Sequence, residues 1–306
     1  MSAQAHGGKD GEFKPIDQAQ ARNCQALHTP GRFTEKAMQP TSESTKLEGE
    51  GGFQEYKAAG KLKDLKALIT GGDSGIGRSV AILYAREGAD VSSVYLPDEQ
   101  EDAEDTKKAI EKEGGSCLLI PGDLMGNDTC KSAVEQHVNK YGRIDVLVNN
   151  ASKQLMCEDF AEIDLDNVES TFRSNVLQMF AITKYALPHM KKGGSIINTT
   201  STVAFRGTAA MVDYAASKGA IVGFTRALAK NLVSKGIRVN AVAPGPVHTP
   251  LQPASRPAEQ MEGFGQKSQL GRPGQPSEVA PSFVFLASRD SELYYGQILH
   301  AYPLGD

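Results

Sequence analysis

Two residues on one expected helix could take part in proton transfer. Tyr214 and Lys218 stand four positions apart in Tyr214-Ala-Ala-Ser-Lys218, and side chains at this spacing lie on one face of a helix. A lysine ammonium beside a phenol favours the phenolate, so we expect the pKa of Tyr214 to fall from about 10 toward neutrality, where the phenol is a usable general acid or base. A surface pair could share this spacing, but of the nine tyrosines only Tyr214 has a lysine four residues on.

A hydroxyl that could bind a substrate oxygen precedes this pair. Ser201 follows an apolar run over 195–199, at the edge where a parallel sheet presents its ligands. It could hydrogen-bond an oxygen on which charge develops. The neighbouring Thr199, Thr200 and Thr202 also carry hydroxyls, so only the spacing to Tyr214 singles out Ser201.

A glycine-rich loop joins the first apolar run to the first amphipathic stretch. It reads Thr70-Gly-Gly-Asp-Ser-Gly-Ile-Gly77. Glycines at the start of a helix let backbone N–H groups approach a phosphate at the positive end of the helix dipole. The loop therefore predicts dinucleotide binding, with a plain strand-to-helix turn as the alternative.

Two other motifs overlap this loop. Gly72-x-x-x-x-Gly-Arg-Ser79 resembles a P-loop, but Arg78 stands in place of the phosphate-gripping lysine, and the run over 144–148 ends in Asn149-Asn150 instead of a magnesium-binding aspartate, which disfavours a nucleoside triphosphatase. Gly72-Asp-Ser-Gly75 resembles a serine-protease nucleophile loop, but that fold is built from β-hairpins.

Short apolar runs alternate with longer amphipathic stretches from residue 65 on. The runs cover 67–70, 91–95, 117–121, 144–148, 195–199, 237–243 and 297–300. The helix-like stretches cover 77–87, 98–113, 128–141, 167–190, 212–235 and 277–287. This alternation predicts an α/β protein with a Rossmann-type, doubly wound parallel sheet of about seven strands and helices on both faces.

Composition divides the chain and limits its partners. Residues 1–60 are polar with no sustained apolar period, which predicts an extended arm before a catalytic domain over 61–306. A net charge of −4 gives no basic field for nucleic acid, and no apolar run is long enough to span a membrane. Four scattered cysteines without metal-ligand spacing predict no metal site and a reducing, cytoplasmic location.

Five motifs in order resemble the short-chain dehydrogenase/reductase family. They are Thr70-Gly-x-x-x-Gly-Ile-Gly77, Asn149-Asn-Ala-Ser152, Ser201, Tyr214-x-x-x-Lys218 and Pro244-Gly245. The likeness covers about residues 61–300. The stretches 118–124 and 238–246, with Pro30-Gly31 and Met38-x-Pro40 in the arm, narrow it to the glucose/ribitol dehydrogenase-like branch, known also from general stress proteins and aldehyde reductases.

The resemblance implies roles for individual residues. Tyr214 would exchange the proton, Lys218 would lower its pKa and hold the nicotinamide ribose, Ser201 would hold the substrate oxygen, and Asn175 would support a proton relay to the lysine. The cofactor would meet the residues Gly71, Asp73, Ser74, Gly75, Ile76, Gly77, Tyr95, Asp123, Leu124, Asn149, Asn150, Ala151, Ser152, Tyr214, Lys218, Pro244, Gly245, Val247 and Thr249.

The chain departs from the family pattern in three places. Ser152 replaces a usual glycine, the ending over 299–306 lacks the usual Asp-Gly-Gly, and no acid closes the second strand at Tyr95-Leu96. Asp98 and Glu99 lie slightly beyond that strand end. Because an NAD-selective site usually carries such an acid, and because Arg78 could meet a 2′-phosphate, the sequence favours NADP(H) over NAD(H).

These features predict reversible hydride transfer between a nicotinamide cofactor and an alcohol/carbonyl pair, such as an aldehyde, ketone, sugar or polyol. The alternative is a sensor or scaffold that binds NAD(P) without turnover. Residues 251–274, rich in Pro, Gly and Gln, are expected to form a lid over the pocket. By resemblance, the apolar faces of 167–190 and 212–235 would pair subunits into a homotetramer or dimer.

Overall fold

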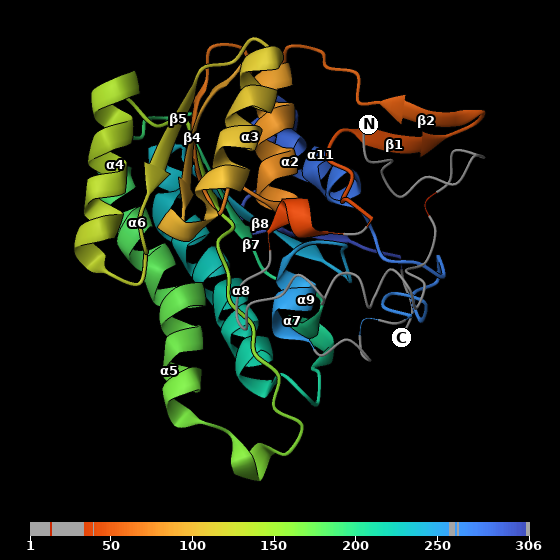
Figure 1. The fold of residues 1–306 in the computed structure, drawn as a ribbon. Coiled ribbons are helices and arrows are strands. Elements are labelled where there is room, and N and C mark those ends of the chain that lie inside the picture. The colour runs from red at the N-terminus through yellow and green to blue at the C-terminus, as the bar shows by residue number, and fades with distance from the viewer. Residues whose placement is uncertain (1–12, 14–33, 39, 257–260, 262, 304–306) are drawn as a thin grey trace.

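The computed structural model describes residues 13, 34–38, 40–256, 261 and 263–303 (Figure 1). Most of the expected arm therefore lies outside the described residues. The same holds for residues 257–260 and 262 of the expected lid and for residues 304–306 of the atypical ending.

Seven parallel strands form the central sheet, in the order β5-β4-β3-β6-β7-β8-β9. The strands are β3 (Lys66–Thr70), β4 (Asp90–Tyr95), β5 (Cys117–Pro121), β6 (Val146–Asn149), β7 (Ser195–Thr199), β8 (Arg238–Pro244) and β9 (Ile298–Ala301). The chain winds outward from β3 in one direction and then from β6 in the other. This confirms the doubly wound fold, and it places the point where the strand order reverses between β3 and β6.

The connecting helices cover both faces of the sheet (Figure 1). They are α2 (Gly75–Arg86), α3 (Gln100–Lys112), α4 (Asn127–Tyr141), α5 (Leu165–Phe172), α6 (Gln178–Ala186), α7 (Val203–Arg206), α8 (Val212–Leu232), α9 (Leu251–Ser255) and α11 (Pro276–Ala287). One apolar core joins the sheet to α2, α3 and α11, and a second joins it to α4, α6 and α8. None of the described helices combines the length and apolar character needed to cross a bilayer.

The helical stretch after β6 is interrupted by a wider turn. Between α5 and α6, residues Arg173–Leu177 form a π-helical segment that contains the buried Asn175. Such π-turns are short and occur often at functional sites. The segment redirects one side chain without ending the helix that was expected over 167–190.

A small antiparallel hairpin precedes the sheet. Strands β1 (Lys46–Gly49) and β2 (Gly52–Glu55) pair through Leu47 and Gln54, and in Figure 1 they stand beside α11. A short 3-10 turn, η1 (Glu35–Ala37), comes before them, and Met38 is buried against Ala254 of α9. The described part of residues 34–56 is thus packed on the domain.

Candidate active site

A cavity of about 1500 Å³ opens at the carboxyl ends of the strands. Segments that follow β3, β4, β5, β6, β7 and β8 all line it, which is where ligands bind in open α/β sheets. Its volume exceeds the roughly 300–1000 Å³ of a pocket for one drug-sized ligand. A dinucleotide and a small substrate together would fit.

The glycine loop leaves no room for side chains. Gly71 and Gly75 have φ values of +63° and +50°, a backbone conformation that favours glycine. A Cβ on Gly77 would lie 1.8 Å from the Gly71 carbonyl oxygen, and one on Gly75 would lie 3.0 Å from Thr249. The loop is therefore a closely packed cradle at the N-terminus of α2, the arrangement that a pyrophosphate requires.

Two buried polar atoms in this wall lack partners among the described residues. They are Oδ2 of Asp73, in the glycine loop, and Oε1 of Gln178, in α6. Both side chains line the cavity. Because buried polar groups in proteins are nearly always hydrogen-bonded, these atoms are suited to accept bonds from a ligand such as a ribose or an amide. The cavity fits a nicotinamide dinucleotide on this ground as well.

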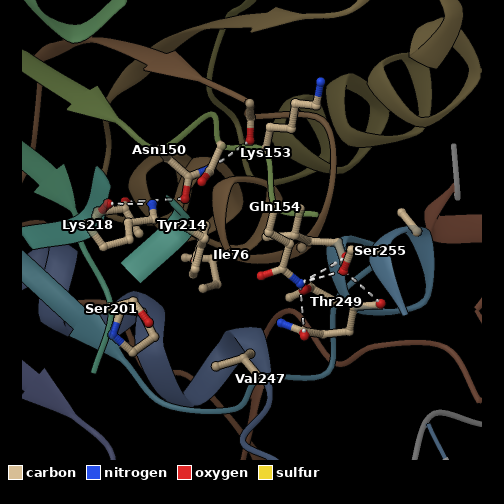
Figure 2. A pocket seen from close by; sticks show the side chains of 18 of the residues that line it. Ile76, Asn150, Lys153, Gln154, Ser201, Tyr214, Lys218, Val247, Thr249 and Ser255 are labelled. Carbon is tan, nitrogen blue, oxygen red and sulfur yellow. Dashed lines mark hydrogen bonds between the residues drawn. The ribbon is translucent and has the colours of Figure 1, made fainter. Parts of the chain in front are cut away.

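Hydroxyl groups meet on the opposite side of the cavity. Tyr214, near the start of α8, is 7% exposed, and its side chain hydrogen-bonds with those of Ser201 and Ser152. Figure 2 shows Tyr214 and Lys218 adjacent to each other, with Asn150 nearby. Burial raises the pKa of Tyr214 to about 12, although both serine hydrogen bonds act in the opposite direction.

The lysine of this pair is fully buried. Its Nζ donates to the Thr199 carbonyl oxygen at 3.0 Å and lies 5.3 Å from the centroid of the Tyr214 ring. Burial lowers the pKa of Lys218 to about 7, because removing an ammonium group from water disfavours its charge. Lys218 can therefore gain and lose a proton near neutral pH.

The expectation that the pKa of Tyr214 lies below its ordinary value is wrong for the protein on its own. The spacing correctly brings the two side chains together. It does not report that both are buried, and burial raises the pKa of the phenol more than the serine hydroxyls lower it.

Asn175 links the loop after β6 to α8. Its Nδ2 donates to the Lys153 carbonyl oxygen at 2.7 Å and to Ser217 Oγ at 3.0 Å. Its Oδ1 accepts from the Lys153 N–H and from Ser152 Oγ. Asn175 does not line the cavity, but it contacts Ser152, which bonds to Tyr214, and Ser217, which precedes Lys218.

Most of the predicted site residues surround this one cavity. Those that line it are Gly71, Asp73, Ser74, Gly75, Ile76, Tyr95, Asp123, Leu124, Asn150, Ala151, Ser152, Ser201, Tyr214, Lys218, Pro244, Gly245, Val247 and Thr249. The predicted residues that do not line the cavity are Gly77, Asn149 and Asn175. Asn149 instead donates to Asn198 Oδ1 at 2.8 Å inside the sheet.

Arg78, which the sequence suggested as a partner for a 2′-phosphate, does not face the cavity. Nη1 of Arg78 donates to Thr106 Oγ1 of α3 at 2.7 Å, and Arg78 is not among the residues that line the cavity. Glu99, a few residues past the end of β4, does line it. An acid thus lines the cavity a few residues past β4, although none closes the strand.

Sequence reasoning missed several residues of the site. In the segment that was expected to form a lid, Ser255 Oγ and Gln252 Oε1 accept hydrogen bonds from Gln154 Nε2 at 2.7 and 3.2 Å. Figure 2 shows Gln154 and Ser255 facing each other across from Tyr214. Arg256 and Arg206 also line the cavity. No motif marks these positions, because segments far apart in the sequence fold together to bring them to one cavity.

Comparison with known proteins agrees with this geometry. Residues 71–301 match the family model described as enoyl-(acyl carrier protein) reductase. The chain is 51% identical to general stress protein 39 of Bacillus subtilis over 81% of its length and 86% of that protein. It is 49% identical to the glucose and ribitol dehydrogenase of Daucus carota, over 80% and 86%.

Two further relatives bear on the cofactor. The chain is 48% identical to the chloroplastic NADPH-dependent aldehyde reductase 1 of Arabidopsis thaliana, over 80% of this chain and 88% of that one. A short-chain dehydrogenase from Burkholderia cenocepacia J2315, solved in complex with NADP, superposes with a TM-score of 0.73 at 31% identity, over 78% of this chain and 97% of that one.

Proposed function

Because this chain belongs to the short-chain dehydrogenase/reductase family of nicotinamide-dependent oxidoreductases, we propose that Tyr214 exchanges a proton with the substrate oxygen. The observation that carries the proposal is the hydrogen bonding of Tyr214 to Ser201 and Ser152 inside the cavity. A bound nicotinamide supplies or accepts the hydride. In reduction, the buried phenol holds its proton until negative charge develops on the carbonyl oxygen.

Ser201 binds that same oxygen in this proposal. Its hydroxyl is hydrogen-bonded to Tyr214, so an oxygen that contacts one hydroxyl can contact the other. Donors already in place where charge develops stabilise a transition state without reorganising.

Lys218 replaces the proton that Tyr214 gives up, and Asn175 holds the surrounding segments in position. Lys218 Nζ lies beside the phenol ring, and its lowered pKa lets it pass a proton on near neutral pH. Asn175 positions the segments on both sides through Ser152 and Ser217. A protein that only sensed NAD(P) would need the glycine loop but no such set, so the arrangement favours an enzyme.

The cofactor lies along the strand ends in this proposal. The glycine loop, Gly71 to Gly77, holds the pyrophosphate, with Gly77 acting through close packing. Tyr95, Asp123 and Leu124 border the adenine. Asn150, Ala151 and Ser152 border the adjoining ribose, and Asn149 supports them from inside the sheet. Pro244, Gly245, Val247 and Thr249 cover the nicotinamide amide, and Tyr214 and Lys218 lie at its ribose.

We propose NADP(H) as the preferred cofactor. The NADPH-dependent aldehyde reductase and the NADP-bound neighbour support this preference. Glu99 at the adenosine end opposes a 2′-phosphate, so the preference over NAD(H) should be below about tenfold, or about 1.4 kcal/mol. Dissociation constants for both reduced cofactors, from nicotinamide fluorescence, measure it directly.

We propose an aldehyde, ketone, sugar or polyol as the substrate, as the named relatives suggest. Oxidation of NADPH and of NADH, followed across a panel of these four classes, tests the proposal. Turnover of at least one class supports it. Cofactor binding without turnover of any class would favour the sensor.

We also propose a homo-oligomer, a tetramer or dimer, in the cytoplasm. Leu177 and Phe180 are 45% and 53% exposed on the helical stretch of α5 and α6. The ring of Phe180 packs at a tilt against that of Phe224 of α8, with 4.4 Å between the ring centroids. Light scattering of the wild type and of Phe180→Asp tests this surface. The described cysteines Cys117, Cys130 and Cys157 are free thiols, which supports a reducing compartment.

We propose, finally, that the arm over 1–60 supports the catalytic domain over 61–306. Its described part contacts α2, α3, α9 and α11. A chain lacking residues 1–60, compared with the full chain in thermal unfolding and NADPH affinity, tests this division.

A further inference from the structure

Acidic and basic side chains are segregated along the walls of the cavity. The acidic residues that line the cavity, among those described, lie in the segments after β3, β4 and β5, which form one half of the sheet. They are Asp73, Glu99 and Asp123. This half holds the adenosine end of the cofactor in the proposed function.

The basic side chains follow the other half. Besides Lys218, those that line the cavity come after β6, β7 and β8, and they are Lys153, Arg206, Arg256 and Lys267. No acidic residue lines this half among the described residues. Tyr214 and Ser201 belong to the same half, so the substrate would meet a positive field.

Arg256 is a base of this half whose charge acts on the reacting hydroxyl. Both Arg256 and Tyr214 line the cavity, and the positive charge of Arg256 lowers the pKa of Tyr214. It is half-buried at the end of α9, where the Phe264 ring lies 5.4 Å from its guanidinium carbon and Nε donates to Gln252 Oε1 at 3.2 Å. These contacts orient the guanidinium within the cavity wall.

The other basic residues of this half are less suited than Arg256 to bind an anion. Lys153 Nζ donates to Ser170 Oγ at 2.7 Å, and in Figure 2 its ammonium end points away from Tyr214. Arg206 and Lys267 are exposed at the rim. Charges at a rim attract an approaching anion, whereas an oriented, half-buried guanidinium can bind one.

We propose that the substrate carries an oxyanion group, a carboxylate or a phosphate, which Arg256 binds while Tyr214 and Ser201 hold the reacting oxygen. The inference rests on the proposed function of Tyr214. A planar guanidinium presents its N–H donors in a fork that matches the paired oxygens of either group. Arg206 and Lys267 speed the entry of such a substrate.

Matched pairs of aldehydes that differ only in charge test the proposal. The pairs are 4-carboxybenzaldehyde with 4-formylbenzamide, and glyceraldehyde 3-phosphate with glyceraldehyde, each reduced with NADPH. We expect kcat/KM of the wild type to favour the anion by at least about tenfold in one pair, and the pair that responds distinguishes carboxylate from phosphate. Added salt should lower kcat/KM for that anion alone.

Variants assign the preference to the residue. Arg256→Gln should lower the anion-to-neutral ratio at least about tenfold, and Arg256→Lys should lower it less. Arg289→Gln, an exposed arginine in the 3-10 turn Arg289–Ser291, should leave the ratio unchanged. Any effect of Arg256 on proton transfer by Tyr214 changes kcat/KM of both aldehydes alike, so the anion-to-neutral ratio is not affected by it. A wild type without anion preference, or an unchanged ratio in Arg256→Gln, would overturn the proposal.

A binding measurement separates this inference from the proposed function. Calorimetry with 4-(hydroxymethyl)benzoate and 4-(hydroxymethyl)benzamide on the NADPH-bound protein involves no turnover. Tighter binding of the anion, lost in Arg256→Gln, supports the anion site even if no aldehyde is reduced, and then only the role of Tyr214 fails. Equal binding of the two alcohols contradicts a carboxylate site whatever the turnover. Glycerol 3-phosphate compared with glycerol tests a phosphate site in the same way, and equal binding within both pairs would overturn the proposal.

Discussion

The carboxylate of Glu35 accepts a hydrogen bond at 2.8 Å from the backbone N–H of Gly75, forty residues later in the chain. Gly75 is the first residue of α2, and the residue before it, Ser74, makes no side-chain cap. Glu35 thus caps the helix that carries the glycine loop. Its own N–H donates to Asp102 Oδ2 of α3 at 2.6 Å, which fixes the turn η1 in this position.

Replacing Glu35 with alanine should destabilise the protein by about 1–2 kcal/mol, the usual cost of removing an N-cap and leaving a buried N–H without a partner. Glu35→Gln keeps an oxygen acceptor and should cost less. Urea unfolding measures both. Glu50→Ala, in the exposed turn between β1 and β2, is the control, and a Glu35→Ala variant as stable as this control would contradict the capping role.

A methyl group on Gly77 should disrupt the glycine loop. The added Cβ would lie 1.8 Å from the Gly71 carbonyl oxygen, a backbone atom that cannot move alone. Overpacking of this kind costs about 1–3 kcal/mol, and we expect the dissociation constant for NADPH to rise at least about tenfold because the loop is displaced.

Gly274→Ala is the matched control for this change, because the nearest atom to its added Cβ is 3.7 Å away. NADPH fluorescence titration and thermal unfolding compare the two variants. Equal affinity in Gly77→Ala and Gly274→Ala would show that the loop does not need glycine at position 77.

Lys218 should make stability depend on pH. Its pKa is about 7 in the folded protein and its ordinary value is 10.5. Below pH 7 the lysine is protonated in both states. Above it the folded protein gives up this proton while the unfolded chain keeps it, so the free energy of unfolding rises with pH, by up to about 1.4 kcal/mol per unit.

The comparison with Lys218→Met isolates this effect, since other titrating groups are common to both proteins. Urea unfolding between about pH 6 and pH 9 should show the wild type gaining stability relative to the variant as pH rises. A constant difference across this range would mean that the pKa of Lys218 is not lowered by burial.

The sheet could be predicted closely from the sequence. Buried parallel strands are continuous apolar runs, and each run between 67 and 300 lies within two residues of a strand in the structure. The hairpin from Lys46 to Glu55 was not predicted, because its strands are four residues each and half of their positions are exposed. Such strands carry no apolar pattern to read.

The site could be predicted where a motif fixes it locally. Tyr214 and Lys218 share a helix, and the glycines share one turn, so their spacing determines their geometry. Glu35 and Arg78 act through hydrogen bonds to residues far along the chain, and Arg256 acts on Tyr214 through its charge. The pKa of Tyr214 depends on how deeply the fold buries it. No local pattern reports these properties.

The most direct test of the account is the turnover of Tyr214→Phe. This variant loses the hydroxyl that bonds to Ser201 and keeps the ring that lies beside Lys218. We predict that kcat falls at least about a hundredfold, the usual contribution of a positioned general acid, while the dissociation constant for NADPH changes less than about threefold, or about 0.7 kcal/mol. Turnover equal to that of the wild type would contradict the assignment of Tyr214 as the proton donor.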